Sequence, residues 1–533
     1  MTSPRVFIGL FEIAGYYSSL HLGLEARGCR TTMVSLASHR FSYAEKPCGW
    51  TGRLIQWHFR RALQVSGHVW PQWMPPWLRR FTGWLAVWLA ALRHDVFFFS
   101  CGLSFADGIV CRDMEPLRRL KRKVIFIFNG SDSRAPYCDR TGYFLENRIT
   151  SAAALKELTR QKAARLSRVH ELADLVIDYP LSGHFHTRRF INFIRLGIPT
   201  VVPSEDELPP PPGSMYPARP IHILHCPSDT GIKGSTEIHR VIDHLKAQGW
   251  NIEFIELRGV PNATVMECIK NSDLVIDQLY SDTPMAGLAR EAAQFARPVI
   301  IAGYAWEELR DHLPPEEWPP AITCHPDRLE ECVRDFLQQG PAAWQEAGLR
   351  GYRFIKDRWS AAQCAGRLLD ALARPDECGI WVDPQSCRYV WGCGMHALET
   401  IESAQVMMRT KGEAGFCLYA KPELLAKTAA LGSMDLMEAQ PAAIPELSSF
   451  DAQTLSVVTS LVERNASLQV ENATMTARLA SLEAQAAAGA KIESVEAELA
   501  EAKAKLENFR AMIKRRDERI EKLEKKLGGK KGS

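Results

Sequence analysis

The sequence lacks the features that mark secreted, membrane-spanning and nucleic-acid-binding proteins. Its start, MTSPRVFIGLFEIAG, has no charged segment followed by a long apolar core, so it predicts a first strand and not a signal peptide. The longest apolar run, Phe81–Leu92, is about half of the ~20 residues that a membrane span needs. Basic and acidic residues nearly balance, at 65 and 62, which excludes a dedicated nucleic-acid binder with a large basic field.

The 14 cysteines also lack the spacing of a disulfide framework. Without an export signal, most of them are predicted to be reduced thiols in a cytosol. Cys378, Cys387, Cys393 and His396 could be placed around a zinc ion, but the paired knuckle spacing of structural zinc sites is missing. Ordinary buried thiols are therefore favoured over zinc, and no metal site is expected.

What is present indicates an α/β protein of two or three domains in 533 residues. Residues 1–205 alternate helical stretches with short apolar runs, which is typical of strands buried on both faces of a parallel sheet. These runs are Val6–Leu10, Val96–Phe99, Val124–Phe128 and Leu175–Tyr179. Residues 206–220, DELPPPPGSMYPARP, follow as a stiff Pro-rich linker.

The same rhythm restarts in residues 221–373, with helices expected to about Leu372. The predicted strands are Ile221–His225, Ile252–Leu257, Leu274–Asp277, Val299–Ala302 and Ala321–Thr323. The sequence thus predicts two Rossmann-like, doubly wound domains joined by a hinge. Residues 374–450 give no readable fold and are expected to form a small irregular region.

Residues 451–533 predict a long coiled-coil helix with a basic tail. Leu461, Leu468, Met475 and Leu482 recur every seven residues, and a second heptad series begins at Ile492. Asn465 and Asn472 fall at core positions, where Asn pairs fix the register of a parallel two-stranded coil. We therefore predict a parallel homodimer through residues 455–527. A hetero coiled coil or a single charged helix is the alternative.

Two loops of the second domain carry the chemistry. The strand Ile221–His225 leads into CPSDTGIKGS and then a helix, and such strand–loop–helix junctions bind phosphates in α/β sheets. Ser228 can donate a hydrogen bond there, and Lys233 adds a positive charge. After the strand Leu274–Asp277, Gly287 opens a helix and Glu291 lies one turn into it, where a carboxylate can accept both hydroxyls of a ribose.

The order PS-x4-KG, SDLVIDQL, G-x3-EA and RPVI resembles the C-terminal half of retaining glycosyltransferases of the GT-B fold. The pattern is most similar to the large group that builds bacterial surface polysaccharides, and the resemblance covers about residues 1–373. The resemblance implies that Lys233 neutralises the diphosphate of a nucleotide sugar and that Ser228 and Gly234 shape the same loop. It also implies that Glu291 holds the ribose and that Gly287 lets the backbone approach the donor.

The chain departs from the family pattern at three points. Ser228 stands where many members have Arg, and Thr283 stands where they have a second acidic residue. The glycine before Glu291 also lies one position later than usual. Because of these departures, the alternative is a domain that has the donor-binding fold but binds the nucleotide sugar weakly or not at all.

The first domain supplies the acceptor side of the expected cleft. Gly15 ends a loop between the first strand and a helix, and NGSDSR follows the strand Val124–Phe128. The latter resembles a G-S-D-x-R turn of some family members, so Gly130, Ser131, Asp132 and Arg134 are predicted to face the cleft, with Asp132 binding hydroxyls and Arg134 approaching phosphate. A structural turn capped by Asp132 is the alternative.

Three further polar residues, Asp178, His184 and His186, follow another strand end and are expected in the same cleft. Packing or surface roles are the alternative for both histidines. The chain contains no D-x-D pair of the kind that holds a metal ion on a diphosphate. Charge neutralisation by Lys233 and backbone N–H groups is expected instead, with no cofactor and no obligatory metal.

Tryptophan is concentrated in one stretch, with seven of the 14 between Trp50 and Trp88. Arginines are interleaved, a combination typical of membrane interfaces. For Phe81–Leu92 we favour a helix that packs Trp84 and Trp88 into the core. For Trp70–Arg80 a membrane-facing surface is the second interpretation.

The resemblance implies a glycosyltransferase that moves a sugar from a nucleotide-diphosphate donor to a glycan or lipid-linked acceptor, with retention. Asp132, Lys233 and Glu291 are its predicted catalytic residues, and no base or nucleophile is assigned. The protein is expected in the cytosol, with peripheral contact at the inner face of the cell membrane as a further option. A non-catalytic scaffold acting through the coiled coil is the main alternative, and an epimerase or phosphorylase of the same fold is the other.

Overall fold

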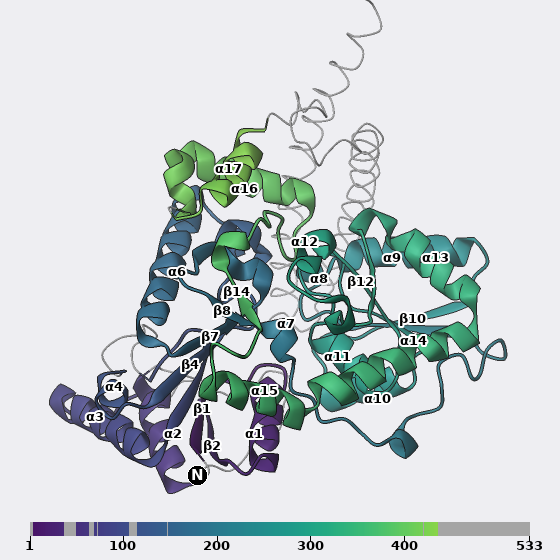
Figure 1. The fold of residues 1–533 in the computed structure, drawn as a ribbon. Coiled ribbons are helices and arrows are strands. Elements are labelled where there is room, and N and C mark those ends of the chain that lie inside the picture. Colours follow the sequence, from purple (N-terminus) through teal and green to yellow (C-terminus); the bar gives the residue numbers. More distant parts are fainter. Residues whose placement is uncertain are drawn as a thin grey trace, which may run out of the picture. The chain divides into compact units, whose positions relative to one another are not determined.

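A computed structural model describes residues 4–36, 49–62, 69–71, 73–105, 114–145, 148–418 and 420–434. Within them, residues up to Ser433 belong to one compact unit that contains two parallel β-sheets (Figure 1). The predicted coiled coil of residues 455–527 and the basic tail lie outside the described residues. All cysteines among those residues are free thiols.

The first sheet has seven strands, and six of them run parallel. In spatial order they are β14 (Trp381–Val382), β8 (Phe190–Asn192), β7 (Leu175–Asp178), β4 (Lys123–Ile127), β3 (Val96–Ser100), β1 (Arg5–Leu10) and β2 (Arg30–Ser35). Strand β14 is antiparallel to β8 and closes one edge. Every residue of β3 is buried, as expected of a central strand covered on both faces.

The helices and the small hairpin of this part follow the chain between those strands. They are α1 (Tyr16–Ala26), α2 (Trp50–Ala62), α3 (Pro76–Arg93), α4 (Glu115–Arg119), the 3-10 turn Pro136–Cys138, α5 (Arg140–Tyr143), β5 (Phe144–Leu145), β6 (Arg148–Ile149), α6 (Ala152–Leu172), the 3-10 turn Pro180–Phe185 and α7 (Phe193–Leu196).

The second sheet has five parallel strands in the order β10 (Ile252–Glu256), β9 (Ile221–His225), β11 (Leu274–Ile276), β12 (Val299–Ala302) and β13 (Ile322–Cys324). Its helices are α8 (Thr230–Lys233), α9 (Ser235–Ala247), α10 (Asn262–Lys270), α11 (Gly287–Gln294), α12 (Trp306–Arg310), α13 (Leu329–Gln339) and α14 (Pro341–Phe354). The chain goes from β9 outwards to β10 and then crosses back to β11, which is a doubly wound topology.

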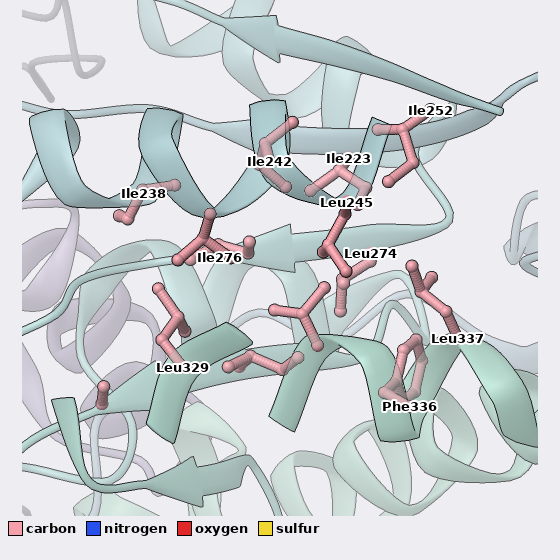
Figure 2. Packing of buried hydrophobic residues seen from close by; sticks show 14 of the residues in the cluster. Ile223, Ile238, Ile242, Leu245, Ile252, Leu274, Ile276, Leu329, Phe336 and Leu337 are labelled. Atoms are coloured by element: carbon pink, nitrogen blue, oxygen red, sulfur yellow. The ribbon is translucent and has the colours of Figure 1, made fainter. Parts of the chain in front are cut away.

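Branched and aromatic side chains form the core of the second sheet domain. Ile223 and Ile276 come from central strands, and helices α9 and α13 cover the same face with Ile238, Ile242, Leu245, Leu329, Phe336 and Leu337 (Figure 2). Each such fully buried side chain stabilises the fold by roughly 1.5–3 kcal/mol. The apolar runs of the sequence therefore place the core correctly.

After a π-turn at Ile355–Trp359, helix α15 (Ala361–Ala373) returns to the first sheet domain and packs on α1. The contact is close, since a Cβ added to Gly23 would lie 2.0 Å from the carbonyl oxygen of Ala361. Arg27 also donates a hydrogen bond to the carbonyl oxygen of Ala362, at 2.8 Å. Helix α15 thus crosses back from the second sheet domain to the first.

The described part of the region 374–450, which ends at residue 434, is not irregular, contrary to expectation. It contains β14, α16 (Ala397–Lys411) and α17 (Pro422–Ser433), and α16 packs on α17, on α6 and on the turn Pro136–Cys138. Its aromatic and glycine-rich sequence hides this order because β14 has only two residues and gains its stability from the edge of an existing sheet.

The favoured packing of Trp84 into the core is wrong. Helix α3 buries its small residues Ala86, Val87, Ala90 and Ala91, while the side chain of Trp84 is 56% exposed. Trp88 is half-buried. The small side chains therefore form the buried side of the helix, while Trp84 faces outwards.

Candidate functional site

The five-stranded sheet changes its winding direction between β9 and β11. In doubly wound sheets, the crevice outside the carboxyl ends of the strands at such a switch point is the usual ligand site. The loop after β9 ends in Lys233, and the loop after β11 begins with Asp277. The two loops with predicted chemistry therefore meet at this point of the sheet.

Lys233 connects these two loops. Its Nζ donates hydrogen bonds to Asp277 Oδ1 at 2.6 Å and to Gln278 Oε1 at 2.7 Å. The Lys233 side chain is 14% exposed, whereas Asp277 is fully buried. The second carboxylate oxygen of Asp277 is buried without a hydrogen-bond partner among the described residues. The Lys233 charge is thus held at the switch point by one carboxylate.

The backbone around Lys233 depends on a glycine. Gly234 has a φ of 70°, and a Cβ there would lie 2.6 Å from Cβ of Leu279. The amide of Leu279 donates to the carbonyl oxygen of Lys233 at 3.1 Å, so the two loops touch directly. Ser228 is exposed in the same loop, and neighbouring Asp229 caps α8 by accepting the amide N–H of Ile232 at 2.9 Å.

Helix α11 contributes the second predicted pair. Gly287 is its first residue, and no side chain caps its N-terminus. Glu291 is only 6% exposed and accepts a hydrogen bond from Asn262 Nδ2 at 3.0 Å. Burial raises the pKa of the Cys226 thiol to about 12, and the nearby Cys268, Asp277 and Glu291 add to the shift.

The start of α11 faces a loop of the first sheet domain. Arg290 donates to the carbonyl oxygen of Ala14 at 3.2 Å, and a Cβ added to Gly287 would lie 3.8 Å from Cβ of Ala14. Gly15 follows with a φ of 75° and begins α1. The predicted Gly15 loop and the predicted Gly287 are therefore adjacent.

Glu12 orders this loop. Its carboxylate accepts N–H groups from Ile13 at 2.8 Å, Tyr17 at 3.2 Å and Ser18 at 2.8 Å. Burial raises the pKa of Glu12, and the hydrogen bonds from Ser18 and its neighbours oppose the shift. No local pattern of the sequence singles out Glu12, because it lies four residues before α1 and Glu is not a preferred N-cap residue.

The turn after β4 is organised by Asp132. Its carboxylate accepts the amide of Gly130 at 2.8 Å and that of Asn129 at 3.1 Å. Burial raises its pKa, and the nearby Asp178 acts in the same direction. Ser131 donates to Asp139 at 3.3 Å. These contacts are those of the capped turn that the sequence analysis gave as its alternative for Asp132.

Arg134 reaches from this turn to the second sheet domain. It makes a two-pronged ion pair with Asp282, in which Nη2 lies 2.7 Å from Oδ1 and Nε contacts Oδ2. The side chains are 13% and 3% exposed. Asp282 belongs to the loop after β11, so the pair joins the loops of both sheets beside the switch point.

His184 and His186 lie in the interior of the first sheet domain. His186 Nε2 is 2.7 Å from Asp178 Oδ2, and its Nδ1 is 2.6 Å from His170 Nε2. Burial raises the pKa of Asp178 to about 8 and lowers that of His186 to about 3, which favours an uncharged pair. His184 lies edge-on to Tyr137 and makes no ring-nitrogen hydrogen bond with any described residue.

A segment whose fold the sequence does not predict also contacts the loops of both sheet domains. We call residues 387–396 the strap. Cys393 exchanges backbone hydrogen bonds with Cys138 and Arg140 of the first domain, and the amide of Gly394 donates to the carbonyl oxygen of Tyr280 at 2.8 Å. Gly394 has a φ of 67° and a Cβ there would lie 2.8 Å from Ile232. The glycines of this segment were the signal for such close approaches.

The candidate site therefore gathers Lys233, Gly234, Gly287 and Glu291 at one sheet edge, with Gly15 opposite. Arg134 joins them through Asp282. Asp132, Gly130 and Ser131 form the turn that carries Arg134, while His184 lies behind it in the first domain.

No group of three or more His, Cys, Asp or Glu side chains in the described part of the chain is arranged to hold a metal ion. The residues considered for zinc have other contacts. Cys378 donates to the carbonyl oxygen of Pro375 at 3.2 Å, Cys387 donates to that of Leu181 at 3.7 Å, and His396 caps α16. The zinc alternative therefore has no support in these contacts.

No protein-family model matches this chain, and no curated protein matches it significantly. Several solved structures are distantly similar. They include HepE of Anabaena with UDP and glucose (12% identity, TM-score 0.39, 70% of this chain and all of that one) and MnaA of S. aureus with UDP (11%, 0.35, 69% and 96%). A glycosyltransferase of Rickettsia africae also matches (11%, 0.35, 69% and 98%). Likenesses this distant assign neither family nor function.

Proposed function

We propose that this chain is a nucleotide-sugar-dependent glycosyltransferase that transfers a sugar to a glycan or lipid-linked acceptor with retention at the anomeric carbon. The observation that carries the proposal is Lys233, a partly exposed cation that bridges the two loops of a β9/β11 switch point. The sequence pattern of residues 226–300 resembles that of the GT-B group, and this resemblance supports sugar transfer as the reaction.

The donor would lie between Lys233 and helix α11. Lys233 has three N–H donors and uses two of them on Asp277 and Gln278, so the third can meet a phosphate oxygen without breaking this pair. The uncapped N-terminus of α11 offers backbone N–H groups to the same diphosphate. Glu291, one turn further, would accept the ribose hydroxyls.

These residues would act on the leaving group. Negative charge grows on the diphosphate as the bond to the sugar breaks, and fixed donors in a partly buried site stabilise it without reorganising. Lys233 and the α11 amides supply such donors. The acceptor hydroxyl would approach from the first sheet domain, where Asp132 and Arg134 form the facing turn. We assign no base and no nucleophile.

The remaining parts of the proposal concern assembly and location. A parallel homodimer through residues 455–527 is supported by the heptad pattern of the sequence. A cytosolic location is supported by the free thiols of the described residues, since disulfides are rare in reducing compartments. No obligatory metal is proposed.

A non-catalytic scaffold is the second candidate function, and one observation favours it. The cations Lys233 and Arg134 are already neutralised, Lys233 by Asp277 and Arg134 by Asp282. In such a protein the paired charges would only hold the two sheet domains together. This role requires no donor binding, so a binding experiment separates the two candidates.

The test is a thermal-shift screen of the full chain with UDP, GDP and CMP and with their sugars. A ligand that binds only the folded state raises the melting temperature. We expect a shift with one nucleotide in the wild type and its loss in Lys233→Met and Glu291→Gln.

Two variants serve as matched controls. Lys246→Met changes an exposed lysine at the end of α9, and Glu267→Gln changes an exposed glutamate on α10. Both should keep the full shift. The absence of any shift, or equal shifts in all variants, would contradict the transferase proposal and favour the scaffold.

A further inference from the structure

Helices α2 and α3 carry an unusual concentration of exposed aromatic side chains. Of the 14 large hydrophobic residues that are exposed among the described residues, nine lie between Trp50 and Leu92, including all five exposed tryptophans. Trp73 is 74% exposed, Trp77 67% and Trp84 56%. The two helices pack side by side (Figure 1), so these side chains share one region of the molecule, which we call the Trp–Arg face.

The spacing on α3 makes this face continuous. Residues 77, 81, 84, 88 and 92 follow the 3.6-residue helical repeat and fall on one side of the helix. The ring of Phe81 stacks on that of Trp84, at 6.2 Å between centroids. The buried residues Ala86 and Ala90 lie on the opposite side of the helix, and the buried Val87 and Ala91 lie between the two sides. The helix therefore buries small residues against the rest of the domain and turns an aromatic stripe outwards.

The charge of this region has one sign. Residues 49–94 contain six arginines and no Asp, Glu or Lys. Arg53, Arg80 and Arg93 are exposed. The guanidinium of Arg93 lies 4.0 Å from the ring centroid of Trp50, and that of Arg61 lies 4.8 Å from the ring of Trp57. Aromatic rings and cations are thus interleaved in space as well as in sequence.

None of the described helices combines the length and hydropathy needed to cross a bilayer. A second copy of this chain is a poor occupant, because a symmetric contact would bring six arginines of each copy together. An anionic lipid surface suits both kinds of side chain on this face. Tryptophan favours the headgroup region, and arginine favours anionic lipids.

We propose that the Trp–Arg face docks the protein on the surface of a membrane that contains anionic lipid, with α3 lying in the plane of the interface. The inference goes beyond the proposed function and holds whether or not the chain transfers a sugar. Docking would place the first sheet domain beside an acceptor that is carried in the membrane.

The test is flotation of the full chain with vesicles of phosphatidylcholine, with or without phosphatidylglycerol, in the absence of nucleotide sugar. We expect flotation only with the anionic vesicles and its decrease as salt rises. The triple variant Trp73→Ser, Trp77→Ser, Trp84→Ser should float at least about tenfold less. Arg53→Gln with Arg80→Gln should weaken flotation in the same direction.

The controls change exposed residues elsewhere. Val201→Ser with Met215→Ser tests general surface hydrophobicity, and Arg168→Gln with Arg353→Gln tests general charge. Both control variants should float like the wild type. Because the substituted tryptophans are exposed, the triple variant should keep the melting temperature of the wild type, which shows that it folds.

Three results would overturn the inference. Failure of the wild type to float with anionic vesicles would contradict lipid docking. Equal flotation of the wild type and the triple variant would assign lipid binding to another part, such as the basic tail. A lipid-free change from dimer to monomer in the triple variant would identify a second copy as the occupant. Quenching of wild-type tryptophan fluorescence by brominated lipid, absent in the triple variant, would support the inference independently.

Discussion

At the scale of single residues, the Arg134–Asp282 ion pair links the two sheet domains. Removing one partner of a buried pair leaves an uncompensated charge, which costs about 3–5 kcal/mol. We expect Arg134→Met to lose roughly this much free energy of unfolding. The double variant Arg134→Met, Asp282→Leu should lose less, since no buried charge remains. Urea unfolding of the full chain measures both.

The exposed pair of Arg168 and Glu171 is the matched control, because its side chains are 43% and 58% exposed. Arg168→Met should change the free energy of unfolding by less than about 1 kcal/mol. If Arg134→Met lowered the free energy of unfolding as little as this control, the ion pair would not stabilise the contact between the domains.

His184 predicts an acid-sensitive stability. Burial, followed by Lys421 and His186, lowers its pKa to about 3, while the backbone of Tyr389 and the charge of Asp282 oppose the shift. The folded pKa lies below the unfolded value, so this contribution to stability is present above about pH 6.5 and is lost as the pH falls towards 3. Between pH 7 and 5 the loss amounts to about 2 kcal/mol.

His184→Phe should remove this contribution. The variant should therefore gain about 2 kcal/mol relative to the wild type when urea unfolding is measured at pH 5 instead of pH 7. Equal changes of both proteins between the two pH values would show that His184 does not lose its proton on folding.

The sequence could identify the residues of the candidate site but not their partners. Lys233, Gly287 and Glu291 follow local patterns of strand, loop and helix, and they lie where such patterns predict. The pairing of Arg134 with Asp282 joins positions 148 residues apart, and no local pattern encodes it. Asp132 caps a turn formed by its own neighbours in the sequence, so a local pattern could predict this role, and the capped turn is the alternative that the sequence gives.

At the scale of elements, strands that are buried on both faces were predicted well. The nine predicted strands all occur, and no end is displaced by more than one residue. Strand β2, with the sequence RTTMVS, was missed because it lies at a sheet edge and is only partly apolar. Strand β14 was missed because two residues carry no periodicity. The orientation predicted for helix α3 is wrong because small residues, and not Trp84, form its buried side.

The contact between α1 and α15 depends on Gly23. A Cβ at this position would lie 2.0 Å from the carbonyl oxygen of Ala361, so the helices would have to separate. We expect Gly23→Ala to destabilise the protein by about 1–3 kcal/mol, as overpacking usually does. Gly49→Ala is the control, since no atom lies within 4 Å of the added Cβ. Similar unfolding curves for the two variants would contradict this packing.

At the scale of the whole molecule, residues up to Ser433 form one compact unit. A chain of residues 1–434 should therefore unfold cooperatively at the melting temperature of the full chain. A chain of residues 1–373 should melt lower or aggregate, because it loses β14, α16, α17 and the strap. If residues 1–373 were as stable as residues 1–434, the strap would contribute nothing to the fold.

The same truncation tests assembly. The heptad pattern predicts that the full chain sediments as a dimer and that residues 1–434 sediment as a monomer. A monomeric full chain would contradict the parallel homodimer.

The most direct test of the central claim is hydrogen exchange of the full chain with and without the nucleotide selected by the thermal screen. The account predicts slower exchange in residues 226–234 and 278–291, which flank the β9/β11 switch point, and no such protection in Lys233→Met. Protection elsewhere, or unchanged exchange in both loops, would contradict a donor site at Lys233.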